Sequence, residues 1–241
     1  MKRFWDAASV HATEAGYAVL LDGKPLRIPG RSPGGQPLAI TAPALAAAIA
    51  AEWQAAGGAM GGELTMADVP LTRLAGTAQD RIAPDPLAIA TALSAYAESD
   101  LLCYRAEHPA LLVAQQAAAW DPWLDWAAVT LGARLYPVAG IVHRVQDPAA
   151  LEAMRRAMAE QTALALAALS IAVPLLGSAV LGLALAEGAV DAASAHGLAM
   201  LDEAFQVEAW GDDADATVRR ARVGEDIALA ERFLRLSREG A

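Results

Sequence analysis

The pattern of apolar and polar positions changes near residue 40. Before it, short β-rich runs alternate with turn signals, and after it apolar residues recur at helical spacing. Residues 16–21 give the clearest strand signal, Asp22-Gly23 is a typical two-residue hairpin turn, and residues 26–28 continue the hairpin. We expect one more short strand at 38–40. A β unit this small is marginally stable alone, so it must pack against the helices.

The remainder of the chain predicts a series of helices. Leu45, Ile49 and Trp53 mark one face of the first helix, which Thr41 is expected to cap. Proline, glycine and acidic residues delimit the others. Further helices are expected at 70–83, 87–98, 109–131, 148–173, 175–187, 191–210 and 213–237, with a short strand at 134–138. The short connections between these helices favour antiparallel neighbours.

Together these elements predict an α+β chain that is mainly α. We expect a small β-rich N-terminal domain at 1–60, which includes the first helix, and a larger C-terminal helical bundle at 61–241. The change in pattern places the boundary between these domains only within residues 40–80. A chain of 241 residues with 56% hydrophobic composition can bury a core without disulfides or metals, and it has one cysteine, Cys103.

The charge of the chain excludes some classes of partner. With 18 basic and 28 acidic residues the formal net charge is −10, which argues against a nucleic-acid-binding protein. It also argues against a basic membrane-surface protein and favours a soluble one.

Residues 161–186 hold no charged side chain and are long enough to cross a bilayer as one helix. The run is rich in alanine, however, and Pro174 interrupts it. We therefore predict two buried helices that break near Val173-Pro174, with no stable membrane insertion. A membrane-anchored protein built on this run is the alternative. The first residues lack the apolar segment of a signal peptide, and they do not resemble an Arg/Ser-rich transit peptide.

Two groups on the helix at 109–131 could carry a function. Trp120, Trp123 and Trp126 share one helix face, which indicates either core packing or an aromatic contact surface for a partner. Asp121 and Asp125 lie one turn apart, so their carboxylates could hold a metal, although a solvated helix face explains them as well.

A stronger resemblance to a metal-binding motif than that of Asp121 and Asp125 is found in three later acids, Asp212, Asp213 and Asp215. Paired aspartates one helical turn apart bind magnesium in all-helical isoprenoid synthases, so a magnesium-dependent enzyme of that type is the alternative function. Here the second group falls on a different face, and capping of a helix explains the acids better. Cys103 and His108 lack an assignable third catalytic group, which favours a buried structural cysteine. We expect no enzymatic activity, no metal and no cofactor.

Short blocks of residues follow one another in an order that runs nearly end to end. The most recognisable is 100–105, Asp-Leu-Leu-Cys-Tyr-Arg. The others are Arg3-Phe4-Trp5, the hairpin at 16–25, Ala51-Glu52-Trp53, 70–74, 77–81, 120–126, 177–184, 201–206 and Trp210-Gly211. In these blocks the chain resembles the assembly chaperones of the F-type ATP synthase that protect the free α subunit of its catalytic head.

The resemblance implies a non-enzymatic chaperone with a small N-terminal β domain and a larger helical domain. Its partner would be the unassembled α subunit, whose nucleotide-side interface it would keep from aggregating until the β subunit arrives. Because the chain starts almost at the first block, the resemblance implies a bacterial cytoplasmic member, whereas eukaryotic relatives work in the mitochondrial matrix.

The resemblance also supplies candidate partner-binding residues. They are Glu52, Trp53, Glu203, Trp210, Asp213 and Asp215. The family usually carries a glutamate shortly after the Trp-Gly pair, where this chain has two aspartates, so a contact that needs the longer side chain would be weakened or shifted. For each candidate, core packing or helix capping is the alternative to binding.

Overall fold

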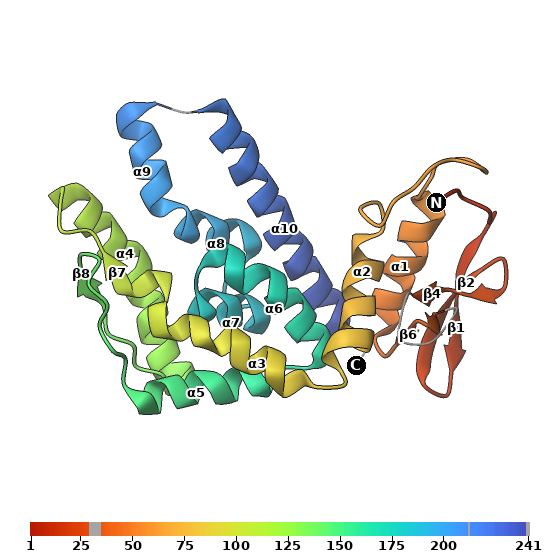
Figure 1. Cartoon of the computed structure of the whole chain (residues 1–241), viewed down its shortest axis with the longest axis horizontal. Coiled ribbons are helices and arrows are strands. Elements are labelled where there is room, and N and C mark those ends of the chain that lie inside the picture. The colour runs from red at the N-terminus through yellow and green to blue at the C-terminus, as the bar shows by residue number, and fades with distance from the viewer. Residues whose placement is uncertain (29–34, 212, 240–241) are drawn as a thin grey trace. The chain divides into compact units, whose positions relative to one another are not determined.

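The computed structural model describes residues 1–28, 35–211 and 213–239, with the side chains at 209 and 210 left aside. The chain forms two compact units (Figure 1). Unit 1 comprises Met1–Pro86, Thr162–Ala168 and Arg232–Ala241. Unit 2 comprises Leu87–Gln161 and Leu169–Glu231.

A small antiparallel sheet forms the first part of unit 1. Its strands are β1 (Ala8–Thr13), β2 (Gly16–Leu21), β3 (Lys24–Pro25) and β6 (Ala39–Ile40). β2 is central, since β1 pairs along one edge while β3 and β6 share the other. β4 (Arg27–Ile28) pairs separately with β5 (Gln36–Pro37). Positive φ angles at Asp22 and Gly23 close the predicted hairpin turn, which is confirmed. The second arm differs from the prediction, because Lys24–Pro25 pairs with β2 while Arg27–Ile28 pairs with β5.

The strand β1 was not expected, because nearly all of its side chains are exposed and show no apolar alternation. Its pairing with β2 from Ala8–Leu21 to Thr13–Gly16 therefore comes from backbone hydrogen bonds rather than from a buried face.

Two helices follow the sheet in unit 1, of which the first packs against the sheet and the second packs against the first. α1 (Pro43–Ala55) contacts β1 and β2 and buries Leu45, Ile49 and Trp53, the face that its sequence predicts. The predicted cap at Thr41 is wrong, because Ala42 occupies the N-cap position without a side-chain hydrogen bond. α2 (Pro70–Thr77) continues into a π-helical turn, η1 (Ala78–Ile82).

Unit 2 is helical apart from one short parallel strand pair, β7 and β8, among its described residues. The elements after η1 are α3 (Pro86–Ser94), η2 (Ala95–Ser99), η3 (Leu101–Cys103), β7 (Tyr104–Arg105), α4 (Ala110–Trp126), η4 (Ala127–Leu131), β8 (Val138–Ala139), α5 (Pro148–Ala159), α6 (Ala163–Leu176), α7 (Ala179–Glu187), α8 (Ala192–Ala199), α9 (Leu201–Trp210) and α10 (Ala214–Arg238). Both α6 and α10 contribute residues to each unit.

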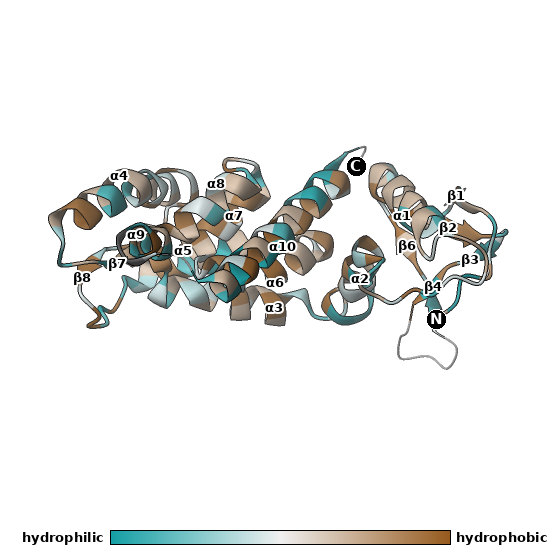
Figure 2. Ribbon diagram, turned by 90° about the horizontal axis from the view of Figure 1, so that it is seen from above, coloured by the Kyte–Doolittle hydropathy of each residue, from teal (hydrophilic) through white to brown (hydrophobic). Residues whose placement is uncertain are grey.

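The helix α7 forms the centre of unit 2. All of its residues except Glu187 are buried, and it contacts α4, α5 and α8. Figure 2 shows the contrast between the hydrophobic α6 and α10, which carries many hydrophilic positions. A helix that is apolar on every side belongs inside a protein core or a membrane.

The uncharged run at 161–186 is divided between α6 and α7. The predicted break at Val173-Pro174 is wrong, because Pro174 lies inside α6 and the helix continues to Leu176. Gly177, at φ +61°, ends α6, and the Oγ of Ser178 caps α7 by accepting a hydrogen bond from the amide of Leu181 over 3.0 Å. Within the described parts of the chain, no helix combines the length and apolar character needed to span a bilayer.

Three other boundaries differ from the sequence prediction. The helix expected at 148–173 ends at Ala159 and restarts at Ala163, and the helix expected at 191–210 is divided at Met200. The strand expected at 134–138 lies at Val138–Ala139 instead. Sequence periodicity continues through such breaks, because neighbouring helices can bury similar faces.

The fold class is confirmed as α+β, mainly α, with the strands concentrated near the N-terminus. Unit 1 extends to Pro86 and takes up two later segments, so the two compact units do not coincide with residues 1–60 and 61–241. The division at residue 60 stays a prediction about independently folding domains.

Candidate functional site

Trp53 lies in the last turn of α1 and has only 4% of its surface exposed. Its indole Nε1 donates a hydrogen bond of 2.7 Å to the Oγ1 of Thr72 in α2. Its ring packs edge-on against Trp5 at 5.0 Å between centroids, and its carbonyl oxygen accepts a hydrogen bond from the Trp5 indole. Trp53 therefore joins the N-terminal segment, α1 and α2, and its contact with a partner stays a prediction.

Glu52 holds the first turn of α2. Its carboxylate accepts hydrogen bonds from the amides of Leu71 at 2.7 Å and Thr72 at 3.0 Å, and from the Thr72 hydroxyl at 2.8 Å. Val69, at the N-cap of α2, supplies no side-chain acceptor, so Glu52 serves as the cap from another helix. Burial raises the pKa of Glu52, while these three hydrogen bonds act in the opposite direction. Glu52 therefore caps α2, and partner binding by Glu52 stays a prediction.

The N-terminal segment presents one aromatic side chain outward. Arg3 is buried and donates to the carbonyl oxygens of Gln54, in the last turn of α1, at 2.8 Å and of Gly58, beyond the end of that helix, at 2.7 Å. Trp5 is fully buried on the other side. Phe4, between these two anchors, has 66% of its surface exposed and meets Trp5 edge-on. Phe4 belongs to the sequence block Arg3-Phe4-Trp5, but the sequence does not show which of the three residues faces solvent. The structure buries Arg3 and Trp5 and leaves Phe4 exposed.

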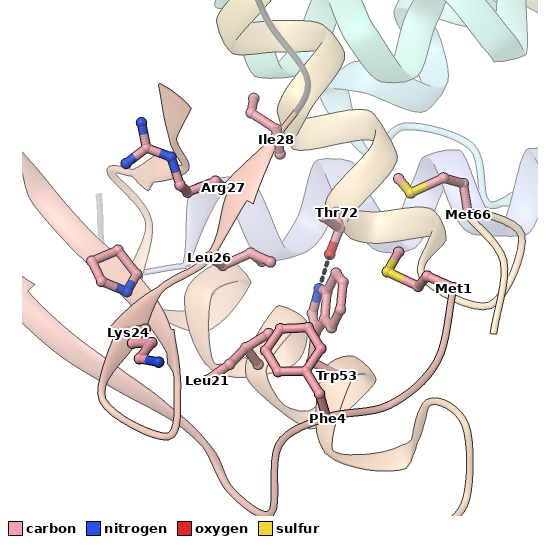
Figure 3. Close-up of a pocket in the computed structure, with 11 residues that line it drawn as sticks. Met1, Phe4, Leu21, Lys24, Leu26, Arg27, Ile28, Trp53, Met66 and Thr72 are labelled. Carbon is pink, nitrogen blue, oxygen red and sulfur yellow. Dashed lines mark hydrogen bonds between the residues drawn. The ribbon is translucent and has the colours of Figure 1, made fainter. Parts of the chain in front are cut away.

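A pocket of about 420 Å³ lies over Trp53 (Figure 3). Phe4 and Leu21 lie on one side of the indole, and the flexible side chains of Met1 and Met66 lie on the other. The remaining lining residues are Lys24, Pro25, Leu26, Arg27, Ile28 and Thr72. Residues from the N-terminus, the β hairpin, α1 and α2 thus form one apolar surface that no local sequence pattern predicts.

The other acidic candidates belong to unit 2, where Glu203 joins α9 to α10. Its Oε1 lies 3.0 Å from Arg220 and 3.2 Å from Arg219. Asp213 precedes α10 and accepts a hydrogen bond of 3.3 Å from the amide of Ala216, as expected for a cap. Asp215 is exposed in the first turn of α10. Glu203 and Asp213 therefore have roles within the fold itself. Partner binding stays a prediction for all three acids, and for Asp215 the structure describes no competing role.

Two candidate positions lie outside what the structure describes. Trp210 is the last residue of α9, but its side chain is not described, and Asp212 is not described at all. Among the residues that are described, no three His, Cys, Asp or Glu side chains come close enough to hold a metal ion.

Three residues from the other patterns singled out in the sequence have structural explanations. Trp120 is fully buried, and its indole donates to the carbonyl of Leu198 over 3.0 Å. Asp121 pairs with Arg105 at 2.8 Å. Burial raises the pKa of Cys103 to about 12, so this cysteine is a neutral thiol at pH 7 and not an activated nucleophile.

A second exposed apolar segment lies between β8 and α5 in unit 2. Ile141 has 95% of its surface exposed, and Val142 and Val145 are also largely exposed. The segment is tied down at two points, since Tyr104 and His143 share a hydrogen bond of 3.0 Å and the Arg144 guanidinium lies 4.9 Å from the centre of the Tyr136 ring. Contiguous exposed apolar side chains of this kind are typical of interaction surfaces.

Comparison with known proteins identifies the family. The model of the ATP12 chaperone protein family matches residues 2–128. The crystal structure of Atp12 from Paracoccus denitrificans is 43% identical, with a TM-score of 0.91 and 98% of each chain covered. A mutant of P. denitrificans Atp12p gives 42% identity and a TM-score of 0.90, also with 98% of each chain covered. Atu1473 from Agrobacterium tumefaciens is 41% identical with a TM-score of 0.86, over 97% of this chain and 84% of that one.

These matches confirm the resemblance seen in the sequence blocks, and with it the expectation of a protein that is not an enzyme. The chain belongs to the ATP12 chaperone family, the non-enzymatic assembly chaperones of the F-type ATP synthase.

Proposed function

We propose that this chain binds the unassembled α subunit of the F-type ATP synthase in the bacterial cytoplasm. Membership in the ATP12 chaperone family is the observation that carries the proposal. The bacterial origin of the solved relatives, Paracoccus and Agrobacterium, supports the compartment.

Two kinds of surface support a role in holding another polypeptide. Unit 1 has the apolar pocket over Trp53 with Phe4 at its mouth, and unit 2 exposes Ile141, Val142 and Val145. A chaperone with one client must cover apolar surface that assembly later buries, and stable interfaces bury about 800 Å² on each partner. The client must also be released, so its affinity for the chaperone must be lower than its affinity for the true assembly partner. We propose that the β subunit displaces the chaperone in this way.

The charge distribution supports a second contribution from unit 2. By sequence, unit 2 contains 8 basic and 19 acidic residues, a net charge of −11, whereas unit 1 contains 10 basic and 9 acidic residues. A strongly acidic surface accelerates association with a basic one and disfavours wrong partners. We propose that Glu203, Asp213 and Asp215 belong to this steering surface, together with an apolar contact by Trp210.

Co-expression tests the proposal. The α subunit and the β subunit are each expressed alone, with this chain, and with an empty vector, and the soluble fraction of each subunit is measured. We expect this chain to raise the soluble fraction of α and not that of β. Equal rescue of both subunits, or no rescue of α, would contradict the assignment of the client.

A further inference from the structure

The apolar pocket of unit 1 continues into a second hollow beside α2. The second hollow has a volume of about 150 Å³ and shares Ile28, Met66 and Thr72 with the larger pocket, so the two adjoin. Its other lining residues are Arg73, Gly76, Thr77, Asp80 and Arg81. We call the combined depression the α2 groove.

The lining at one end of the α2 groove is mostly apolar. Among the described residues that line this end, Thr72 carries a hydroxyl that already donates to Glu52 and accepts from Trp53. Phe4, Leu21 and the two methionines surround the indole (Figure 3). Methionine side chains adapt to different apolar shapes, and a volume of about 420 Å³ lies within the range of about 300–1,000 Å³ that ligand pockets occupy.

The other end of the groove is cationic. Arg73 and Arg81 are exposed, and no carboxylate of the described residues lies within 4.0 Å of either guanidinium. The acid beside them, Asp80, accepts a hydrogen bond of 3.3 Å from the Gln36 amide. Lys24 and Arg27 add positive charge on the strand side of the apolar end (Figure 3).

This positive charge is a local property of the groove, because the chain as a whole carries a net charge of −10. Arginine presents a planar set of donors that matches a carboxylate, so exposed and unpaired Arg73 and Arg81 fit an acidic partner group.

We propose that the α2 groove holds one segment of the client polypeptide, with apolar side chains over Trp53 and carboxylates against Arg73 and Arg81. This inference rests on the proposed function for the identity of the client. The chemistry of the segment follows from the groove itself, since an apolar pocket that adjoins exposed guanidinium groups selects an apolar side chain close to an acidic one.

The first test uses peptides and needs no client. The probe is a fluorescein-labelled library of short peptides in which Leu or Phe residues precede Asp or Glu residues at varied spacing. Anisotropy is measured with the wild-type chain, with Arg73→Glu/Arg81→Glu, and with the matched control Arg235→Glu/Arg238→Glu, whose exposed arginines lie in unit 1 outside the groove. We expect peptide binding to weaken about tenfold or more in Arg73→Glu/Arg81→Glu, the groove variant, and to stay unchanged in the control. The groove variant should instead prefer peptides in which Lys replaces the acidic residues.

The apolar end is tested in the same assay. Phe4→Ser should weaken peptide binding without unfolding the chain, because Phe4 is mostly exposed. Met60→Ser is the matched control, since Met60 is an exposed apolar residue of unit 1 that does not line the groove. Equal affinity for wild type and groove variants, or no binding of any library peptide by the wild type, would overturn the inference. Wild-type self-association that is lost in the groove variant would assign the groove to a second copy and would also overturn it.

A second test separates this inference from the proposed function. The same variants are co-expressed with the α subunit. If the wild type and Arg73→Glu/Arg81→Glu rescue α equally, the groove inference fails while the proposed client stands. If the wild type does not rescue α, the proposed client fails, and the peptide assay alone decides whether the groove binds apolar–acidic segments.

Discussion

The carboxylate of Asp100 accepts a hydrogen bond of 3.1 Å from the amide of Val180, although the two residues are 80 positions apart. Its other oxygen accepts from the amide of Leu102 at 3.1 Å, and the Ser178 hydroxyl also bonds to the carboxylate. One fully buried side chain therefore fixes the turn at η3 and the first turn of α7. The most recognisable sequence block, 100–105, begins with this residue, which connects two segments of unit 2.

Asp100 should make stability depend on pH. Burial raises its pKa from 3.8 to about 6, so between about pH 4 and 6 the folded chain holds a proton that the unfolded chain has lost. The contribution of Asp100 to the free energy of unfolding therefore falls as pH rises through this window, by about 3 kcal/mol in total, and is constant above it.

Denaturant unfolding of wild type and Asp100→Asn at about pH 4.5 and pH 7 checks this. The variant loses stability at both pH values, because an amide cannot accept all of these hydrogen bonds, but the gap between wild type and variant should be larger at the lower pH. A gap that is the same at both pH values would show that Asp100 has an ordinary pKa.

Glu52→Ala should destabilise the chain by about 1–2 kcal/mol, because the first amides of α2 then lack their acceptor. The measurement is the denaturation midpoint at pH 7. Glu14→Ala is the matched control, since Glu14 is exposed in the β1–β2 turn. Equal midpoints for the two variants would remove the capping role of Glu52.

Trp53→Ala should cost about 3–5 kcal/mol, because it removes a large buried aromatic side chain that packs on Trp5. Trp53→Phe keeps an aromatic ring against Trp5 and loses part of the buried ring surface together with the hydrogen bond to Thr72, so its loss of stability should be smaller. Thermal melting of both variants, with Phe4→Ala as an exposed aromatic control, gives the comparison. An unchanged melting temperature for Trp53→Ala would be incompatible with the packing described.

Gly182 allows α7 to approach α6 closely. A Cβ atom at this position would lie 2.4 Å from the Cγ2 of Val173, so Gly182→Ala should lose about 1–3 kcal/mol. Val173→Ala removes the clash, and the double variant should be more stable than the sum of the two single losses predicts. Gly197→Ala in α8 is the control: nothing lies within 4 Å of its added methyl group, so a gain of about 0.5–1 kcal/mol is expected. Additive losses at Gly182 and Val173 would contradict the contact.

The acids of α9 and α10 should steer the client if the proposed function holds. Glu203→Lys/Asp215→Lys should slow association with the α subunit and make the rate less sensitive to salt. Stopped-flow association at two ionic strengths measures this, with Glu225→Lys/Asp226→Lys as an equal change of charge elsewhere on α10. An identical salt dependence in the wild type and the Glu203/Asp215 variant would exclude steering by these acids. If Asp213 serves only as a cap, Asp213→Ala should cost about 1 kcal/mol of stability and leave association unchanged, whereas slower association of this variant would assign Asp213 to the steering surface as well.

Local patterns in the sequence determined much of the secondary structure. The Asp22-Gly23 turn, the buried face of α1 with Leu45 and Ile49, and the start of α2 at Pro70 all depend on residues close to one another in the chain. Turn geometry and amphipathic spacing are local properties, so they can be read without the tertiary fold. Ordered sequence blocks also determined the family, because they span nearly the whole chain.

The tertiary structure alone decided the boundaries inside apolar runs and the partners of polar side chains. Pro174 lies inside α6 although it lacks an amide donor, and the helix ends only at Gly177, where the φ angle is positive. Glu52 was a candidate contact for a partner, and its carboxylate instead caps α2 from 19 residues away. Hydrogen bonds between distant segments leave no periodic signal, because they depend on how the segments are brought together.

The α2 groove has the same origin. Phe4, Leu21, Trp53 and Arg73 come from four separate segments, and each by itself reads as an ordinary apolar or charged residue. The sequence determines which side chains are available, but the packing of α1 and α2 beside the hairpin decides which of them share a surface and which face solvent.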